Sequence, residues 1–90
     1  MFIYTIYDCK TNVLAEPKLC PLPWPERGNL GMLFLSHCAA NPEKKLVMVM
    51  FLPNKPTATM VQPIEHQELT DYQLDLIESR ARELVGSTQN

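Results

Sequence analysis

The sequence predicts a small α+β domain in which an antiparallel sheet of three to five short strands is packed by a C-terminal helix. Two observations predict the sheet: residues 1–7 and 46–52 are rich in β-branched, aromatic and other apolar side chains. A third, the capped amphipathic pattern that begins at Thr70, predicts the helix. The 90 residues suit one domain, which we place at 1–86, and the apolar content of 46% predicts a packed core.

The first strand is expected to start a hairpin. Residues 1–7 are followed by a polar turn at 8–12 and by a short apolar run at 13–15 that can return beside the first strand. Pro17 ends this run, because proline has no N–H to donate to a sheet.

A proline-rich segment occupies residues 16–29. Its prolines exclude a helix and disfavour a strand, and they lie at Pro17, Pro21, Pro23 and Pro25. Their alternation with other residues favours an extended, polyproline-like path. Trp24, the only tryptophan, lies in the middle of this path.

Residues 30–40 fit two structures. As a second helix, they would begin after Asn29, a good N-cap, and end before Pro42. As a strand, they would pair with residues 46–52 across the loop at 41–44. The absence of β-branched side chains favours the helix.

The run LVMVMFL at 46–52 is apolar on both faces, which predicts a central strand that is covered on both sides. A turn at 53–56 leads into an alternating segment at 57–64, and together they predict a second hairpin. Pro63 predicts that this last strand lies at the edge of the sheet.

The C-terminal helix has the clearest start. Thr70 and Gln73 form a capping box, and Leu69 and Leu74 are spaced as a hydrophobic staple. An apolar stripe at helical spacing is expected to face the sheet, and it comprises Leu74, Ile77, Ala81, Leu84 and Val85. Gly86 suits the position just past the helix, so we predict a frayed tail at 87–90.

The charge balance is weakly acidic, with a net charge of −2. Proteins that bind the phosphate backbone of nucleic acids usually carry a basic excess on one face, so such binding is disfavoured. The basic residues Lys44, Lys45 and Lys55 keep a nucleic-acid-binding regulator open as an alternative.

Three cysteines and two histidines are the residues with the most reactive chemistry, namely Cys9, Cys20, Cys38, His37 and His66. Structural zinc usually takes ligands in close pairs, and the only close pair here is His37 with Cys38, whose side chains would point in different directions. A nucleophilic pair of Cys38 with His66, or of Cys20 with His37, lacks support from the flanking sequence. We therefore predict no enzyme, no metal and no cofactor, and keep a thiol or metal-binding protein as an alternative.

The compartment is predicted from three features. The first residues lack the basic start of a signal peptide, and the longest apolar run, at 46–52, is too short to cross a bilayer. An odd, low cysteine count is poor material for a disulfide framework. Together these features favour the cytoplasm and disfavour a membrane location.

The candidate binding residues come from the proline-rich loop and from the sheet, and they are Leu22, Trp24, Met48, Met50 and Met60. Long loops with a large aromatic are typical of binding sites, although Trp24 is better explained as an anchor to the core. If residues 30–40 form a strand, one face of the sheet lacks a helix and would be an interface, most simply that of a homodimer. These features predict a non-enzymatic protein-binding domain, either an adaptor or an inhibitor of a larger protein. Small inhibitors of this kind are encoded by phages and mobile elements, which are one candidate origin of the chain.

Overall fold

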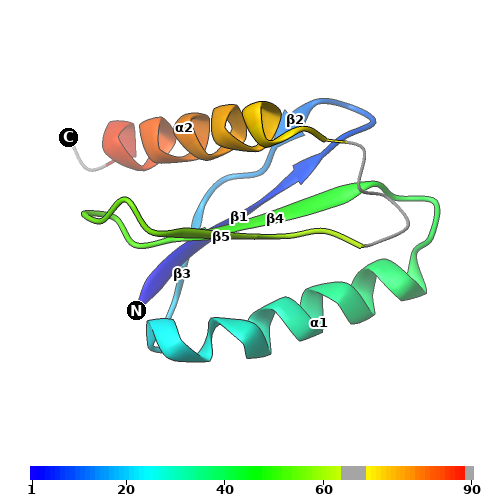
Figure 1. Ribbon diagram of the computed structural model, residues 1–90, viewed down its shortest axis with the longest axis horizontal. Helices are drawn as coiled ribbons and strands as arrows, with labels where there is room; N and C mark the ends of the chain where they lie inside the picture. Colours follow the sequence, from blue (N-terminus) through cyan, green and yellow to red (C-terminus); the bar gives the residue numbers. More distant parts are fainter. Residues whose placement is uncertain (64–68, 89–90) are drawn as a thin grey trace.

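The computed structural model describes residues 1–63 and 69–88, and these form a five-stranded antiparallel sheet with two α-helices (Figure 1). The α+β class is therefore confirmed. In chain order the elements are β1 (Phe2–Asp8), β2 (Val13–Leu14), β3 (Lys18–Cys20), the 3₁₀ helix η1 (Trp24–Glu26), α1 (Arg27–Ala40), β4 (Leu46–Phe51), β5 (Ala58–Val61) and α2 (Asp71–Thr88).

The centre of the sheet is the pair β1 and β4, which runs antiparallel from Ile3 opposite Phe51 to Asp8 opposite Leu46. β5 pairs with the other side of β4, while β2 and β3 share the other side of β1. β5 is thus an edge strand, as Pro63 predicts.

The first hairpin differs from the prediction in one respect. β2 returns beside β1 as expected, after a turn in which Asn12 adopts a left-handed conformation (φ 57°) and accepts a hydrogen bond from the Tyr7 hydroxyl. The prediction missed β3, which pairs with β1 inside the proline-rich segment. Pro17 and Pro21 flank β3 without occupying it, so its own N–H groups remain available to the ladder.

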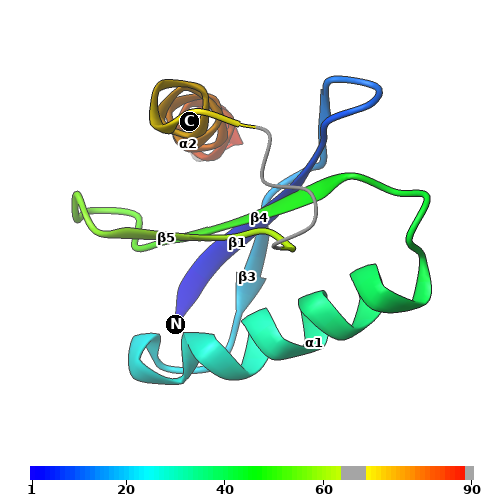
Figure 2. The ribbon, with the colours of Figure 1, turned by 45° about the vertical axis from the view of Figure 1, so that its right-hand side comes forward.

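Of the two structures open to residues 30–40, the helix is correct, and the strand alternative is wrong. α1 begins at Arg27, earlier than predicted, because η1 leads directly into it. α1 lies on one face of the sheet and α2 on the other (Figures 1 and 2). No sheet face is left without a helix in the described part of the chain, so a homodimer is not needed to cover the sheet.

The core has two halves, one on each face of the sheet. Under α1, Met48 and Met50 of β4 cluster with Phe2 of β1 and with Phe34 and Cys38 of the helix. On the other face, three alternate β4 residues cluster with buried α2 residues, the set being Val47, Val49, Phe51, Ile77 and Ala81. Because successive strand residues point to opposite faces, every residue of β4 is buried, as its sequence predicts.

The start of α2 confirms the capping box. The Thr70 N–H donates to Gln73 Oε1 at 2.8 Å, and the Gln73 N–H donates to Thr70 Oγ1 at 3.2 Å. The helix continues through Gly86 to Thr88, so the predicted end at Gly86 is wrong. The prediction of a strand as far as residue 64 lies partly outside the described residues; β5 itself ends at Val61.

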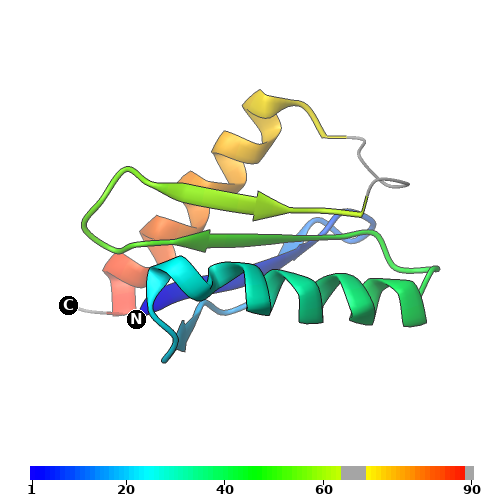
Figure 3. The ribbon, with the colours of Figure 1, turned by 60° about the horizontal axis from the view of Figure 1, so that its bottom comes forward.

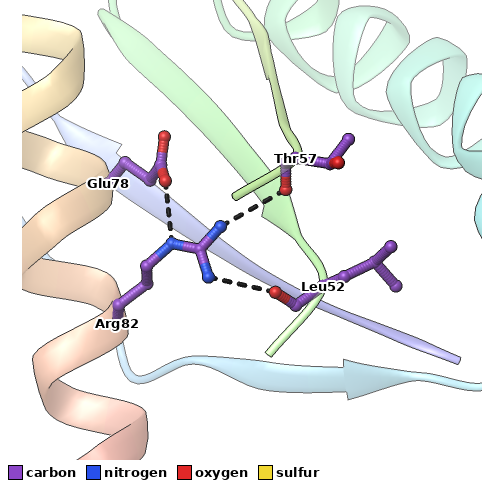
Figure 4. A network of polar contacts seen from close by, with 4 residues as sticks. All are labelled: Leu52, Thr57, Glu78 and Arg82. Carbon is purple, nitrogen blue, oxygen red and sulfur yellow. Dashed lines mark hydrogen bonds and ion pairs between the residues drawn. The ribbon is translucent and has the colours of Figure 1, made fainter. Parts of the chain in front are cut away.

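Arg82 fastens α2 to the β4–β5 hairpin (Figure 4). Its Nε donates to Glu78 Oε2 at 2.7 Å, and its two terminal nitrogens donate to the carbonyl oxygens of Leu52 at 3.0 Å and Thr57 at 3.3 Å. The guanidinium carbon lies 4.8 Å from the centre of the Phe51 ring. The Arg82 side chain therefore forms an ion pair, two hydrogen bonds to carbonyl groups and a contact with an aromatic ring.

Candidate protein-binding groove

Helix α1 is apolar around most of its circumference. Its buried residues are Gly31, Phe34 and Cys38, yet Met32 and Leu33 on its outer side are 67% and 69% exposed. Between Gly28 and Ala40 the helix contains no Asp, Glu, Lys or Arg. A helix that is apolar on all sides is typical of one that is buried on all sides, so its outer surface is a candidate contact surface.

A groove of about 400 Å³ lies between α1 and the edge strand β5, two elements that lie near one another in Figure 3. Residues of η1, α1, β4 and β5 line it, and they are Pro25, Arg27, Gly28, Gly31, Met32, Leu35, Met50, Thr59 and Val61. The volume falls in the range of ligand-binding pockets, and most of the lining side chains are apolar.

Two glycines shape the groove. A Cβ added at Gly31 would lie 3.4 Å from Val61 Cγ2 and 3.9 Å from Met50 Cε, which are ordinary contact distances, so α1 lies close to β5 at this position. A Cβ at Gly28, one turn earlier, would meet nothing within 4 Å, and this end of the groove is open. The groove is therefore narrow beside Gly31 and open beside Gly28.

Arg27 supplies the only charge among the lining residues. Its guanidinium carbon lies 4.6 Å from the centre of the Trp24 ring, close enough for a cation–π interaction. Its Nε donates to Thr59 Oγ1 at 3.0 Å, and one terminal nitrogen donates to the Trp24 carbonyl at 3.1 Å. No carboxylate among residues 1–63 and 69–88 forms an ion pair with Arg27.

The five predicted binding residues do not form one surface. Met48 and Met50 are only 2% and 1% exposed, and Met60 is half-buried against the α2 half of the core. Leu22 and Trp24 are half-buried against the α1 half, where Trp24 stacks edge-to-face on Phe2 with ring centres 5.7 Å apart. Trp24 thus has the contacts of a core anchor, and of the five only Met50 lines the groove.

Sequence reasoning missed the other groove residues because they come from segments far apart in the chain. Arg27 and Thr59, which share a hydrogen bond, are 32 positions apart. One signal was present: Gly28, Gly31, Met32 and Leu35 recur at helical spacing and trace one side of a helix without charges.

The three cysteines and His37, which lie in the described part of the chain, are not part of a metal-binding group there. Cys20 and Cys38 are buried free thiols, and burial raises the pKa of Cys38 above its usual value. His37 is exposed, and its contacts are with Asn41 at the helix end. No group of three or more His, Cys, Asp or Glu side chains within the described residues is arranged to hold a metal ion. His66, considered above as a partner for Cys38, lies outside those residues.

The three lysines of the nucleic-acid alternative do not share a surface. Lys44 and Lys45 precede β4, whereas Lys55 lies in the hairpin that follows it. A six-residue strand separates the two positions by roughly 20 Å. They therefore do not form the single basic patch that a phosphate-backbone site requires.

Comparisons with protein-family models, with curated protein sequences and with solved structures gave no match for this chain. Neither helix, within the part of the chain that the structure describes, combines the length and the apolar character that a bilayer span requires.

Proposed function

We propose that this chain is a non-enzymatic protein-binding domain, an adaptor or an inhibitor, whose partner contacts the outer side of α1 and the adjoining groove. The observation that carries the proposal is the exposure of Met32 and Leu33 on a helix that has no charged side chain from Gly28 to Ala40. The cytoplasm remains the proposed compartment, in keeping with the buried free thiols of Cys20 and Cys38.

The contrast with α2 supports this choice of surface. α2 also exposes large side chains, Tyr72, Leu76 and Leu84, but they are interspersed with acidic and basic residues along the same helix. Scattered apolar residues of that kind are normal on a protein surface. On α1 the exposed Met32 lines an apolar groove instead, which is the arrangement typical of an interaction site.

A photo-crosslinking amino acid placed at Leu33 tests the proposal in cells of the native host. Tyr72 is the matched control position, because it is 72% exposed against 69% for Leu33 but lies on α2. We expect a specific adduct with another protein from position 33 and none from position 72. Excess unlabelled wild-type chain should suppress this adduct, whereas excess Leu33→Glu chain should not.

Two results would count against the proposal. Equal adducts from positions 33 and 72 would indicate non-specific contact. An adduct from position 33 that the wild-type chain does not suppress would show that α1 does not form a saturable site.

A further inference from the structure

The outer edge of β5 has a regular set of unpaired backbone groups. The Cys9 N–H donates to the Lys45 carbonyl at 2.8 Å, so the odd-numbered residues along β4 direct their N–H and C=O groups toward β1. The Ala15 N–H donates to the Ile6 carbonyl at 2.9 Å, so the even-numbered residues of β1 direct their backbone groups toward β2, away from β4. The even-numbered residues along β4 therefore face β5.

The register between β4 and β5 then determines which β5 groups point outward. Met48 lies opposite Val61 and Met50 opposite Thr59, so these are the hydrogen-bonded pairs. Ala58 and Met60, and Gln62 just after them, direct their N–H and C=O groups away from β4. Within the described residues no strand pairs with that side of β5.

The side chains of β5 alternate in the same way between the two faces of the sheet. Thr59 and Val61 line the groove under α1, whereas Ala58 and Met60 belong to the core under α2. A strand added beside β5 would therefore place the side chains opposite Thr59 and Val61 on the groove side.

The two edges of the sheet differ in their protection. The edge formed by β2 and β3 is interrupted at Pro17 and carries Glu16 and Lys18, features that discourage strand addition. The β5 edge is continuous from Ala58 to Val61, and residues 56–63 contain no charged side chain. Of the two edges, only that of β5 can accept another strand without burying a charge.

Charge decides between a second copy and a different occupant. If two copies paired through β5 about a two-fold axis, the second Arg27 would lie near the first. The two like charges would repel, and no acidic side chain lines the groove to neutralise them. A segment that carries a carboxylate would instead pair with the guanidinium, which has further N–H donors beyond the two used for Thr59 and Trp24.

We propose that the β5 edge and the α1 groove together bind an extended segment of a partner protein as an added antiparallel strand, with a carboxylate of that segment on Arg27. This proposal rests on the proposed function and names the part of the partner that is recognised. All strand pairs of the sheet are antiparallel, and α1 and β5 run in the same direction (Figure 3). The carboxylate therefore lies C-terminal to the apolar side chain that enters the groove beside Gly31.

Amide hydrogen exchange of the whole chain, measured by NMR at a low and a high protein concentration, tests the open edge. We expect fast exchange at Ala58, Met60 and Gln62 and slow exchange at Thr59 and Val61, unchanged by concentration. Protection of Ala58 and Met60 that grows with concentration, with a doubling of mass in solution, would show that a second copy occupies the edge and would overturn the proposal.

A random peptide library displayed with free C-termini, selected on the wild-type chain, supplies the probe. We expect enriched peptides to alternate apolar with other residues and to contain a carboxylate, and the bound peptide to slow exchange at Ala58 and Met60. Arg27→Gln should weaken binding about tenfold, whereas Lys18→Gln on the opposite edge should not. Each peptide is also synthesised as a C-terminal amide, which separates a terminal carboxylate from an Asp or Glu side chain.

N-methylation of the peptide provides the control for backbone pairing. Methyl groups on one alternate set of peptide amides should abolish binding, and methyl groups on the other set should leave it. Peptides that tolerate both patterns, peptides that protect no β5 amide, or a library without enrichment would overturn the proposal. A specific crosslink at position 33 alongside any of these results would keep the proposed function and reject only the added strand.

Discussion

Each helix is joined to the sheet through an arginine that stacks on an aromatic ring, and the two arginines differ in how far their donors are used. Arg82 of α2 has Glu78, two backbone carbonyls and the Phe51 ring around it. Arg27 at the start of α1 has the Thr59 hydroxyl, one carbonyl and the Trp24 ring, and none of the described carboxylates.

The difference shows what each side of the sheet contributes. Arg82 completes a network within the protein, on an amphipathic helix whose start is capped by Thr70 and Gln73. Arg27 lies in a groove beside an open strand edge, at the start of a helix that has no other charged side chain. The α2 side has the contacts of a structural element, and the α1 side keeps unused apolar surface and unused donors, which are what a partner requires.

The largest change in stability is expected at Arg82, whose side-chain nitrogens all donate to groups of the protein itself. Arg82→Ala should lower the free energy of unfolding by about 3 kcal/mol, because two carbonyls and Glu78 lose a charged partner at once. Urea denaturation measures this loss. Arg80→Ala, an exposed arginine on the same helix, is the control, and it should change stability by less than about 0.5 kcal/mol.

Arg27→Ala should lower the free energy of unfolding by about 1 kcal/mol, because it removes two hydrogen bonds to neutral groups and one cation–π contact without leaving a carboxylate unpaired. The same urea denaturation measures it. A loss as large as that of Arg82→Ala would break the comparison, since it would make Arg27 an equally structural residue.

Gly31→Ala should raise the free energy of unfolding by about 0.5 kcal/mol, since alanine favours the helix and its Cβ would lie at an ordinary contact distance of 3.4 Å from Val61. Thermal unfolding followed by circular dichroism suits this small gain. Gly28→Ala, where a Cβ meets nothing within 4 Å, is the control for helix propensity alone. A loss at position 31 with a gain at 28 would show that α1 packs on β5 too tightly for any side chain.

The smallest effect concerns Cys38, whose pKa is raised by burial from a reference value of 9.0. Below that value the thiol is neutral in both the folded and the unfolded chain, so its contribution to stability is complete. As the pH rises past 9.0 the unfolded chain ionises first, and this contribution is lost. Unfolding free energies measured across that range should fall less for Cys38→Ala than for the wild type. Equal slopes would indicate that the thiol is solvated.

The sequence by itself determined the elements whose signals are local. β1 and β4 follow from runs of β-branched and apolar residues, and the start of α2 follows from a cap that spans four positions. The edge position of β5 followed from Pro63, because a missing N–H is a property of one residue. Such signals need no knowledge of distant neighbours.

Tertiary structure decided the rest. An uncharged run such as residues 30–40 suits a helix or a strand equally in periodicity, and contact with the β4 face selects between them. β3 forms because β1 offers it an edge, although its flanking prolines argue for a loop. The groove exists only because α1 and β5 meet at Gly31 and Val61, although β4 lies between them in the chain. A surface assembled from distant segments has no local pattern, because its residues become neighbours only when the chain has folded.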